Sequence, residues 1–286
     1  MTRYVVGILG AGNMGKQLAI LFASRGIYVL LWNHKIQVNF TKDFNKLLKI
    51  QSKLGNINKE QISEITDRVT YINDINIMHD SDIIIEAVKE DKHVKFGVLK
   101  KIDSVAKNAQ FISTNTSTLS ILELGSCTSR PDRFLGIHFF NPPMMMRLVE
   151  VIKSELTTNE TVFKAIEFLS TFDKTPVILN DTPGFIVNRL LFSMINEAIF
   201  LLSEGVTDAK TIDRCMKLGA NQPMGPLELA DLIGLDVCLR ILENLVKKTG
   251  DAKYKPAKLL KNYVCAGKIG KKSGCGFYNY KTNVLD

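Results

Sequence analysis

Apolar and polar residues alternate along the chain with two different periods. Short apolar runs predict strands at 4–9, 27–32, 69–72, 82–86, 110–114, 134–139, 148–152 and 176–179. Between several of these runs apolar residues recur at helical spacing, which predicts helices at 14–25, 38–54, 92–106 and 161–172. Strands that alternate with helices favour an α/β fold, here a Rossmann-like, doubly wound and mostly parallel sheet covered on both faces.

The pattern changes at Asp181-Thr182-Pro183-Gly184, because every element predicted beyond it is a helix. These helices are expected at 185–204, 208–218, 227–232, 237–249 and 257–266. A Pro-Gly pair is typical of a break between structural elements. We therefore expect a dinucleotide-binding domain at residues 1–182 and an all-helical domain at residues 183–286.

The formal net charge of +8 would suit nucleic acid, an anionic lipid surface or a polyanionic small ligand. The lysines are spread along the chain, and no arginine-rich run or recognised nucleic-acid module is present, so we expect no nucleic-acid partner. The apolar segment 185–202 carries Asn188, Arg189 and Glu197, which are costly in a hydrocarbon core, so we expect no membrane span. Attraction of a phosphate-rich ligand remains a secondary effect of the charge.

Composition places the chain among globular proteins, with 45% apolar and 23% charged residues. The five cysteines are scattered and form no C-x-x-C pair, which predicts neither a disulfide framework nor a metal site and favours a reducing compartment. The first residues lead into an apolar run without a signal-peptide pattern. We therefore expect a cytoplasmic protein.

A glycine-rich segment, Gly10-Ala11-Gly12-Asn13-Met14-Gly15, follows the first predicted strand and opens the first predicted helix. In a G-x-G-x-x-G motif the first glycine allows a tight turn, the second lets a pyrophosphate approach, and the third permits close packing of helix on strand. The helix N-terminus then supplies N–H groups for the phosphates. The motif predicts dinucleotide binding; the alternative is a glycine turn with a purely structural role.

The end of the second predicted strand carries Asn33 where a dinucleotide-binding domain usually has an acid. A carboxylate there would bind the ribose diol and repel a 2′-phosphate. Asn33 can still hydrogen-bond a hydroxyl group, and the nearby Lys35 either neutralises a phosphate or points into solvent. The sequence therefore leaves both NAD and NADP open as the cofactor.

His138 ends an apolar strand, where open α/β sheets place their ligands, and Glu150 lies inside the apolar run 148–152. A neutral histidine is the usual group for taking up a hydroxyl proton near neutral pH. A carboxylate buried in so apolar a strand needs a partner, and His138 is the obvious one. The alternative is a Glu150 that faces solvent from an alternating strand.

Two further polar segments have both a structural and a functional interpretation. Residues 113–117 follow an apolar strand and end at Ser117, but small polar side chains also suit any turn. Asn188 lies in an apolar helix and must be satisfied, either by capping or bridging helices or by reaching a site between the domains.

Together these segments resemble the 3-hydroxyacyl-CoA dehydrogenases over essentially the full chain, and most closely the single-function bacterial members that act on 3-hydroxybutyryl-CoA. The resemblance rests on ordered motifs at 10–15, 115–117, 136–142, 148–152, 183–189, 216–220, 223–226 and 271–278. A set of motifs in one order and spacing is far more specific than any one of them. The family also implies a homodimer built through the helical domain, which takes part in substrate binding.

The resemblance implies a role for each matching catalytic position. His138 would be the catalytic base and Glu150 the carboxylate that orients it and stabilises its charged form. Ser117 and Asn188 would hydrogen-bond the reacting oxygen or the thioester carbonyl.

The resemblance also implies a set of cofactor contacts and a stretch that contacts CoA. Asn141 and Lys272 would lie near the cofactor, and Glu90 and Lys95 near cofactor and CoA, while the stretch 42–53 falls where the family contacts CoA phosphates. The full cofactor set is Gly10, Gly12, Asn13, Met14, Gly15, Asn33, Glu90, Lys95, Asn115, Asn141 and Lys272.

The expected activity is that of an NAD(P)-dependent enzyme which interconverts a 3-hydroxyacyl-CoA and a 3-ketoacyl-CoA by hydride transfer. One alternative is a dehydrogenase of the same build that acts on a free hydroxy acid or a polyol. Another is a non-catalytic NAD(P)-binding protein, in which loss of His138 or Glu150 would be expected; both residues are present.

Overall fold

The structure, a computed structural model, describes residues 4–281 of the chain. It divides into two compact units, Met1–Thr182 and Pro183–Asp286. The first contains all the named strands, and the second is built from α-helices and short 3-10 helices. Among the described residues, no helix is both long enough and apolar enough to cross a membrane.

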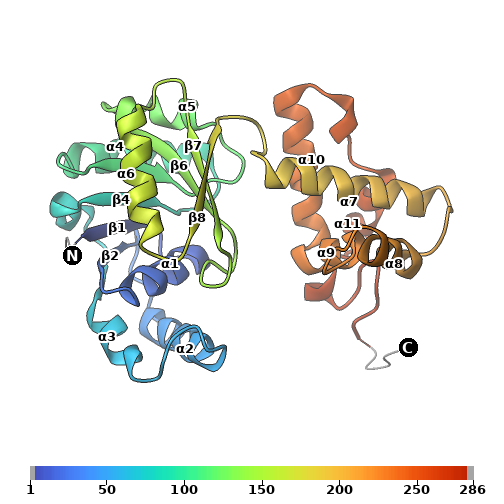
Figure 1. Cartoon of the computed structure of the whole chain (residues 1–286), viewed down its shortest axis with the longest axis horizontal. Coiled ribbons are helices and arrows are strands. Elements are labelled where there is room, and N and C mark those ends of the chain that lie inside the picture. The colour runs from blue at the N-terminus through green and yellow to red at the C-terminus, as the bar shows by residue number, and fades with distance from the viewer. Residues whose placement is uncertain (1–3, 282–286) are drawn as a thin grey trace. The chain divides into compact units, whose positions relative to one another are not determined.

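The first unit is built on one eight-stranded sheet with the strand order β3-β2-β1-β4-β5-β6-β7-β8 (Figure 1). Every neighbouring pair is parallel except β6 and β7. This confirms the doubly wound, mostly parallel sheet that the sequence predicts. The strands are β1 (Val5–Leu9), β2 (Tyr28–Trp32), β3 (Val69–Ile72), β4 (Ile83–Glu86), β5 (Phe111–Thr114), β6 (Phe134–Phe139), β7 (Leu148–Lys153) and β8 (Thr175–Asn180).

The antiparallel pair follows from the length of its connection. Residues 140–147 join β6 to β7, whereas a parallel neighbour would need a crossover of about a dozen residues or more. The sequence pattern gives the two strands but not their relative direction. As a result β7 begins at the same edge of the sheet at which β6 ends.

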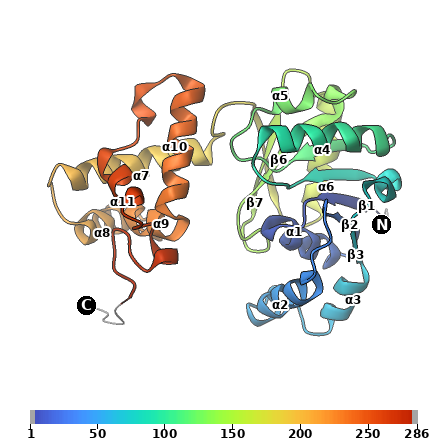
Figure 2. The same ribbon diagram turned by 180° about the vertical axis from the view of Figure 1, so that it is seen from behind.

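Helices cover both faces of the sheet. Figure 1 shows α6 in front of the sheet, and Figure 2 shows α4 in front when the chain is seen from behind. Helix α5 and the 3-10 helices were not predicted; α5 has only five residues, too few for a helical period to show. The helices are α1 (Asn13–Ala23), α2 (Phe40–Lys53), α3 (Gln61–Asp67), α4 (Lys92–Val105), α5 (Ile121–Gly125) and α6 (Asn159–Ser170), with the 3-10 helices η1 (Ile75–Asp80) and η2 (Pro131–Arg133).

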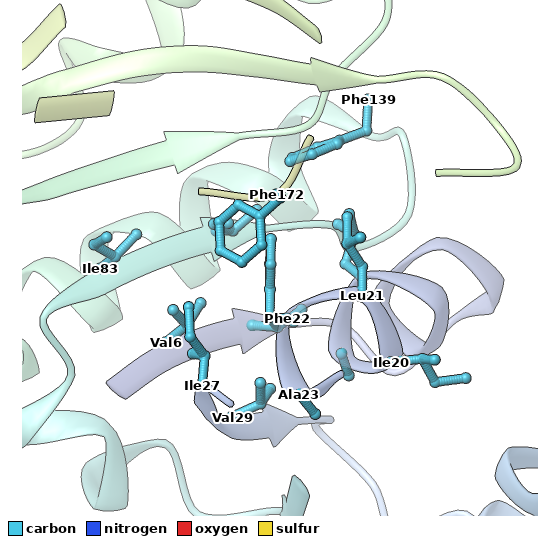
Figure 3. Close-up of a cluster of buried hydrophobic side chains, with 14 of the residues drawn as sticks. Val6, Ile20, Leu21, Phe22, Ala23, Ile27, Val29, Ile83, Phe139 and Phe172 are labelled. Carbon is cyan, nitrogen blue, oxygen red and sulfur yellow. The ribbon is translucent and has the colours of Figure 1, made fainter. Parts of the chain in front are cut away.

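An aromatic cluster holds α1 and α6 against one face of the sheet (Figure 3). The ring of Phe22 lies 6.1 Å from that of Phe139, 5.4 Å from that of Phe168 and 5.0 Å from that of Phe172. All four side chains are buried, and each contributes roughly 1.5–3 kcal/mol by leaving water. The cluster therefore fixes α1, which begins at the glycine-rich turn, against the end of β6.

Within the described residues, the second unit packs five α-helices around a core that includes Ile195, Leu227, Leu242 and Leu260. Buried Asp231 accepts main-chain hydrogen bonds from residues 277 and 278, which ties the C-terminal segment to this core. The elements are α7 (Val187–Ser203), α8 (Ala209–Gly219), α9 (Pro226–Ile233), α10 (Leu235–Thr249) and α11 (Lys258–Cys265), with η3 (Ala252–Tyr254) and η4 (Lys271–Ser273).

Candidate active site

The glycine-rich turn between β1 and α1 is tight on its inner side and open on its outer side. Gly10 has φ +114°, and a Cβ there would lie 2.6 Å from the carbonyl oxygen of Ala87. A Cβ on Gly15 would lie 1.9 Å from the carbonyl oxygen of Gly10, so only glycine fits at either position. A Cβ on Gly12 would meet no atom within 4 Å. The backbone is therefore open to a ligand at the point where α1 begins, the arrangement that a pyrophosphate requires.

Asn13 and Met14 form the first turn of α1, with Asn13 exposed and Met14 half-buried. The N-terminal N–H groups of this helix have no partner in the preceding turn of the helix, which makes its start a site for anions. The residues present therefore fit the dinucleotide that the motif predicts.

The turn after β2 is ordered by its own hydrogen bonds. Asn33 donates from Nδ2 to the carbonyl oxygen of Lys35 at 2.7 Å, and the Tyr71 hydroxyl donates to the same oxygen at 3.1 Å. His34 and Lys35 are exposed, and residues 33–36 contain no carboxylate. Nothing in this turn would repel a 2′-phosphate.

His138 and Glu150 form a buried pair across the antiparallel strands β6 and β7. They are direct partners in the register, and His138 Nδ1 lies 2.8 Å from Glu150 Oε2. His138 is 5% exposed and Glu150 is 1% exposed, so the alternative of a solvent-facing Glu150 is wrong. A carboxylate beside Nδ1 fixes the orientation of the ring, which also lies 4.7 Å from the ring of Phe140. The geometry is that of a histidine base with an orienting acid.

The turn after β5 lies at the same sheet edge and is tied to both neighbouring strands. Asn115 donates from its main-chain nitrogen to the carbonyl oxygen of Glu86 at 2.7 Å. Its side-chain Oδ1 accepts from the main-chain nitrogen of Phe139 at 2.9 Å, next to His138. Asn115 thus holds the turn that carries the half-buried Ser117 beside the end of β6.

Asn141 follows the end of β6 and is exposed. Its Oδ1 accepts from Gln17 Nε2 at 3.0 Å, which links this loop to α1. Gln17 was not among the predicted site residues. Its position two residues after Gly15 gives no pattern that would have marked it.

Lys95 was expected near cofactor and CoA, which stays a prediction; the structure places its ammonium group in the interior. It is 1% exposed, with Nζ 2.8 Å from both carboxylate oxygens of Glu86 and 3.2 Å from Glu90 Oε2. Glu86, at the end of β4, is fully buried and was missed. A carboxylate that ends the apolar run 83–86 is the same signal that marked Glu150, and it would have found Glu86 as well.

The two carboxyl groups beside Lys95 are shifted in opposite directions. Burial raises the pKa of Glu86 in spite of the opposing charge of Lys95. Burial alone would also raise the pKa of Glu90, but the charge of Lys95 and the hydrogen bonds from Thr116 and Thr118 outweigh it, so that the pKa of Glu90 is lowered. The contacts with Lys95, Thr116 and Thr118 thus favour the ionised form of Glu90.

The remaining predicted residues belong to other elements of the chain. Lysines of the stretch 42–53 project from α2 and are exposed. Asn188 lies within the first turn of α7, whose cap residue is Ile186, so Asn188 does not cap the helix. Lys272 lies in η4, with its Nζ 2.5 Å from Asp236 Oδ1.

Residues 4–281 contain no group of three or more His, Cys, Asp or Glu side chains that could hold a metal ion.

The fold and the glycine-rich turn define a dinucleotide-binding α/β protein with an added helical unit. The comparisons with known proteins make this class more specific. Residues 5–182 match the family model described as 3-hydroxyacyl-CoA dehydrogenase, NAD binding domain, and residues 184–280 match that of the 3-hydroxyacyl-CoA dehydrogenase C-terminal domain.

Relatives cover nearly the whole chain. It is 43% identical over 278 residues to a 3-hydroxybutyryl-CoA dehydrogenase of Clostridioides difficile, covering 96% of this chain and 99% of the relative. It is 41% identical over 276 residues to a probable 3-hydroxybutyryl-CoA dehydrogenase of Bacillus subtilis, covering 96% of each. The crystal structure of (S)-3-hydroxybutyryl-CoA dehydrogenase from Ralstonia eutropha matches with a TM-score of 0.92 and 37% identity, covering 98% of this chain and 100% of that one. The chain belongs to the 3-hydroxyacyl-CoA dehydrogenase family, a family of oxidoreductases.

Proposed function

We propose that the chain interconverts (S)-3-hydroxybutyryl-CoA and acetoacetyl-CoA with a nicotinamide cofactor. The observation that carries the proposal is the buried His138–Glu150 pair, with its 2.8 Å contact, at the sheet edge where β6 ends. Open α/β sheets bind their ligands at this edge. The named relatives act on the same substrate class.

In the oxidation, His138 takes the proton from the C3 hydroxyl group as the carbonyl forms. The bound nicotinamide supplies the acceptor for the hydride. Glu150 stabilises the resulting imidazolium through Nδ1, and in the reverse direction the same histidine returns the proton to the oxygen. General acid–base help of this kind contributes about 10²–10⁴-fold to the rate.

Ser117 and Asn188 are proposed to hydrogen-bond the reacting oxygen or the thioester carbonyl, and Asn141 and Lys272 to contact the cofactor. The exposed lysines of α2 suit the phosphates of CoA. We further propose a cytoplasmic homodimer, with residues 183–286 as the substrate and dimerisation domain. The free cysteines, five within the described residues, suit a reducing compartment.

The test is reduction of acetoacetyl-CoA by His138→Ala, with His79→Ala as the control because His79 is an exposed histidine of η1. His138→Ala should lower kcat by about 10²–10⁴-fold. Its affinity for NADH should change less than twofold, as measured by quenching of Trp32, the single tryptophan of the chain. Normal turnover by His138→Ala would remove the assignment. Equal activity with free acetoacetate would favour the dehydrogenase of a free hydroxy acid.

We propose that NADPH is accepted as well as NADH. This rests on the turn at 33–36, where Asn33 is bonded within the turn and the exposed His34 and Lys35 leave room for a phosphate. Asn33→Asp should raise the NADH-over-NADPH ratio of kcat/KM by about tenfold or more. The new carboxylate would repel the 2′-phosphate of NADPH and would bind the ribose diol of NADH. An unchanged ratio, or a wild-type enzyme inactive with NADPH, would contradict this proposal.

A further inference from the structure

A chain of polar contacts runs from the interior of the sheet to the turn that carries Ser117. We call it the β4–β5 network; its members are Glu86, Glu90, Lys95, Thr114 and Thr116. Its inner members are buried: Glu86, Thr114 and Thr116 are 0% exposed and Lys95 is 1% exposed. Only Glu90, with 37% of its side chain exposed, reaches the surface.

The inner end of the network is fully satisfied. Glu86 Oε1 accepts from Lys95 Nζ at 2.8 Å and from the main-chain nitrogen of Val88 at 2.6 Å. Glu86 Oε2 accepts from Lys95 Nζ at 2.8 Å and from Thr114 Oγ1 at 2.6 Å. The ammonium group of Lys95 is therefore fixed at the end of β4 by a carboxylate that is itself bonded to β5.

The outer end of the network holds backbone. Glu90 Oε2 lies 3.2 Å from the same ammonium group. Its Oε1 accepts from the main-chain nitrogens of Ser117 and Thr118, at 3.0 and 3.1 Å, and from the hydroxyl groups of Thr116 and Thr118. One carboxylate oxygen thus gathers the donors of the turn that carries Ser117.

We propose that Glu86 and Lys95 are positioning residues for Ser117, which they hold in place through Glu90. The inference rests on the proposed function, because it gives Ser117 its role in the reaction. Neither Glu86 nor Lys95 is required to touch the substrate.

The charges of the network argue for this role over a purely stabilising one. A buried ion pair is weak evidence for stability, because apolar residues of similar volume often serve as well. Apolar residues at 86 and 95 would fill the same space, but they would leave Glu90 without the cation that holds its Oε2. The contact between Lys95 and Glu90 is explained only if the turn that carries Ser117 has to be held in place.

The first test measures amide hydrogen exchange in the free enzyme, so that it does not depend on activity. Lys95→Met should speed exchange in the segment 116–118 by about tenfold, the value of one lost charge-assisted hydrogen bond. Lys92→Met is the matched control, since Lys92 lies on the same helix and pairs at the surface with Glu123. It should leave exchange in 116–118 unchanged.

Lys95→Met leaves Glu86 buried without its cation, which by itself destabilises the fold. A second variant separates this loss of stability from the loss of the positioning contact. Glu86→Gln/Lys95→Met removes both buried charges and should melt within a few degrees of the wild type. It should still show fast exchange in 116–118, because Glu90 has lost its cation. Wild-type exchange in this double variant would overturn the inference.

The second test is kinetic. In the double variant kcat for acetoacetyl-CoA should fall about tenfold, while the affinity for NADH changes less than twofold. The single variant Lys95→Arg, which keeps the positive charge, should retain a larger part of the wild-type kcat than the double variant. A fall in NADH affinity alone, with kcat intact, would overturn the positioning role. If the wild type does not reduce acetoacetyl-CoA, the proposed function fails, and the exchange experiment still decides whether Glu86 and Lys95 hold the turn.

Discussion

Replacing Glu150 with glutamine tests the catalytic pair without changing its shape. Glu150 is 1% exposed, and its Oε2 lies 2.8 Å from His138 Nδ1. The substitution keeps the volume of the side chain and removes its charge. A neutral amide can accept one hydrogen bond from the ring, but it cannot stabilise an imidazolium as an anion does.

The magnitude follows from the contact. A hydrogen bond to a charged group contributes about 1.5–3 kcal/mol, and about 1.4 kcal/mol corresponds to a factor of ten. Since the imidazolium forms along the reaction, the loss falls on the transition state. Glu150→Gln should therefore lower kcat about 10- to 150-fold, and more if the amide selects the wrong tautomer of the ring.

The assay is oxidation of (S)-3-hydroxybutyryl-CoA, the direction in which the imidazolium forms, followed by the absorbance of the NADH produced, with NADH affinity measured from Trp32 fluorescence. Glu160→Gln is the control, because Glu160 is an exposed glutamate of α6 that pairs with Lys164 at the surface. A Glu150→Gln enzyme with the kcat of the control would refute the reasoning. A loss of NADH affinity in proportion to kcat would show that the carboxylate acts on cofactor binding instead.

Three further outcomes follow from the structure. Gly15→Ala would place a Cβ 1.9 Å from the carbonyl oxygen of Gly10, so NADH affinity should fall at least tenfold by titration, and an unchanged affinity would rule out the turn as the pyrophosphate site. Burial would raise the pKa of Asp103, but hydrogen bonds from residue 129 and Arg130 outweigh it and lower the pKa. Its stabilisation is thus present above the ordinary pKa of 3.8 and lost as the pH falls through the lowered value, so Asp103→Asn should lower Tm at pH 7 and the difference should narrow in acid. Burial raises the pKa of Cys238 to about 12, so iodoacetamide at about pH 8 should leave it unmodified in mass spectra while exposed cysteines react.

Periodicity was sufficient to predict the strands, because each is a short apolar run; the runs of β1 and β4–β7 are largely buried, whereas those of the edge strands β3 and β8 are more exposed. It failed where an element is too short to show a period, as in α5, or where the information lies in a connection, as in the direction of β7. Helix ends differ by a residue or two from those predicted, since termini depend on caps such as Asp91 and Asp208.

The candidate site was predicted in part. The pairing of His138 with Glu150 followed from the cost of burying a lone carboxylate, and the structure shows the contact. The interior position of Lys95 did not follow, because a lysine in an amphipathic helix gives no sign of which way it points. The roles of Asn188 and Lys272 stay predictions, as each depends on a bound substrate or cofactor.

The antiparallel register of β6 and β7 also determines where homologues can tolerate insertions and deletions. A shift of one residue in either strand would bring Val149 or Val151 opposite His138 and turn the carboxylate to the other face of the sheet. The connecting loop at 140–147 is held separately, through Asn141 to Gln17 and through the carbonyl oxygens of Pro143 and Met146 to the buried Lys174. Insertions and deletions among homologues should therefore spare both strands.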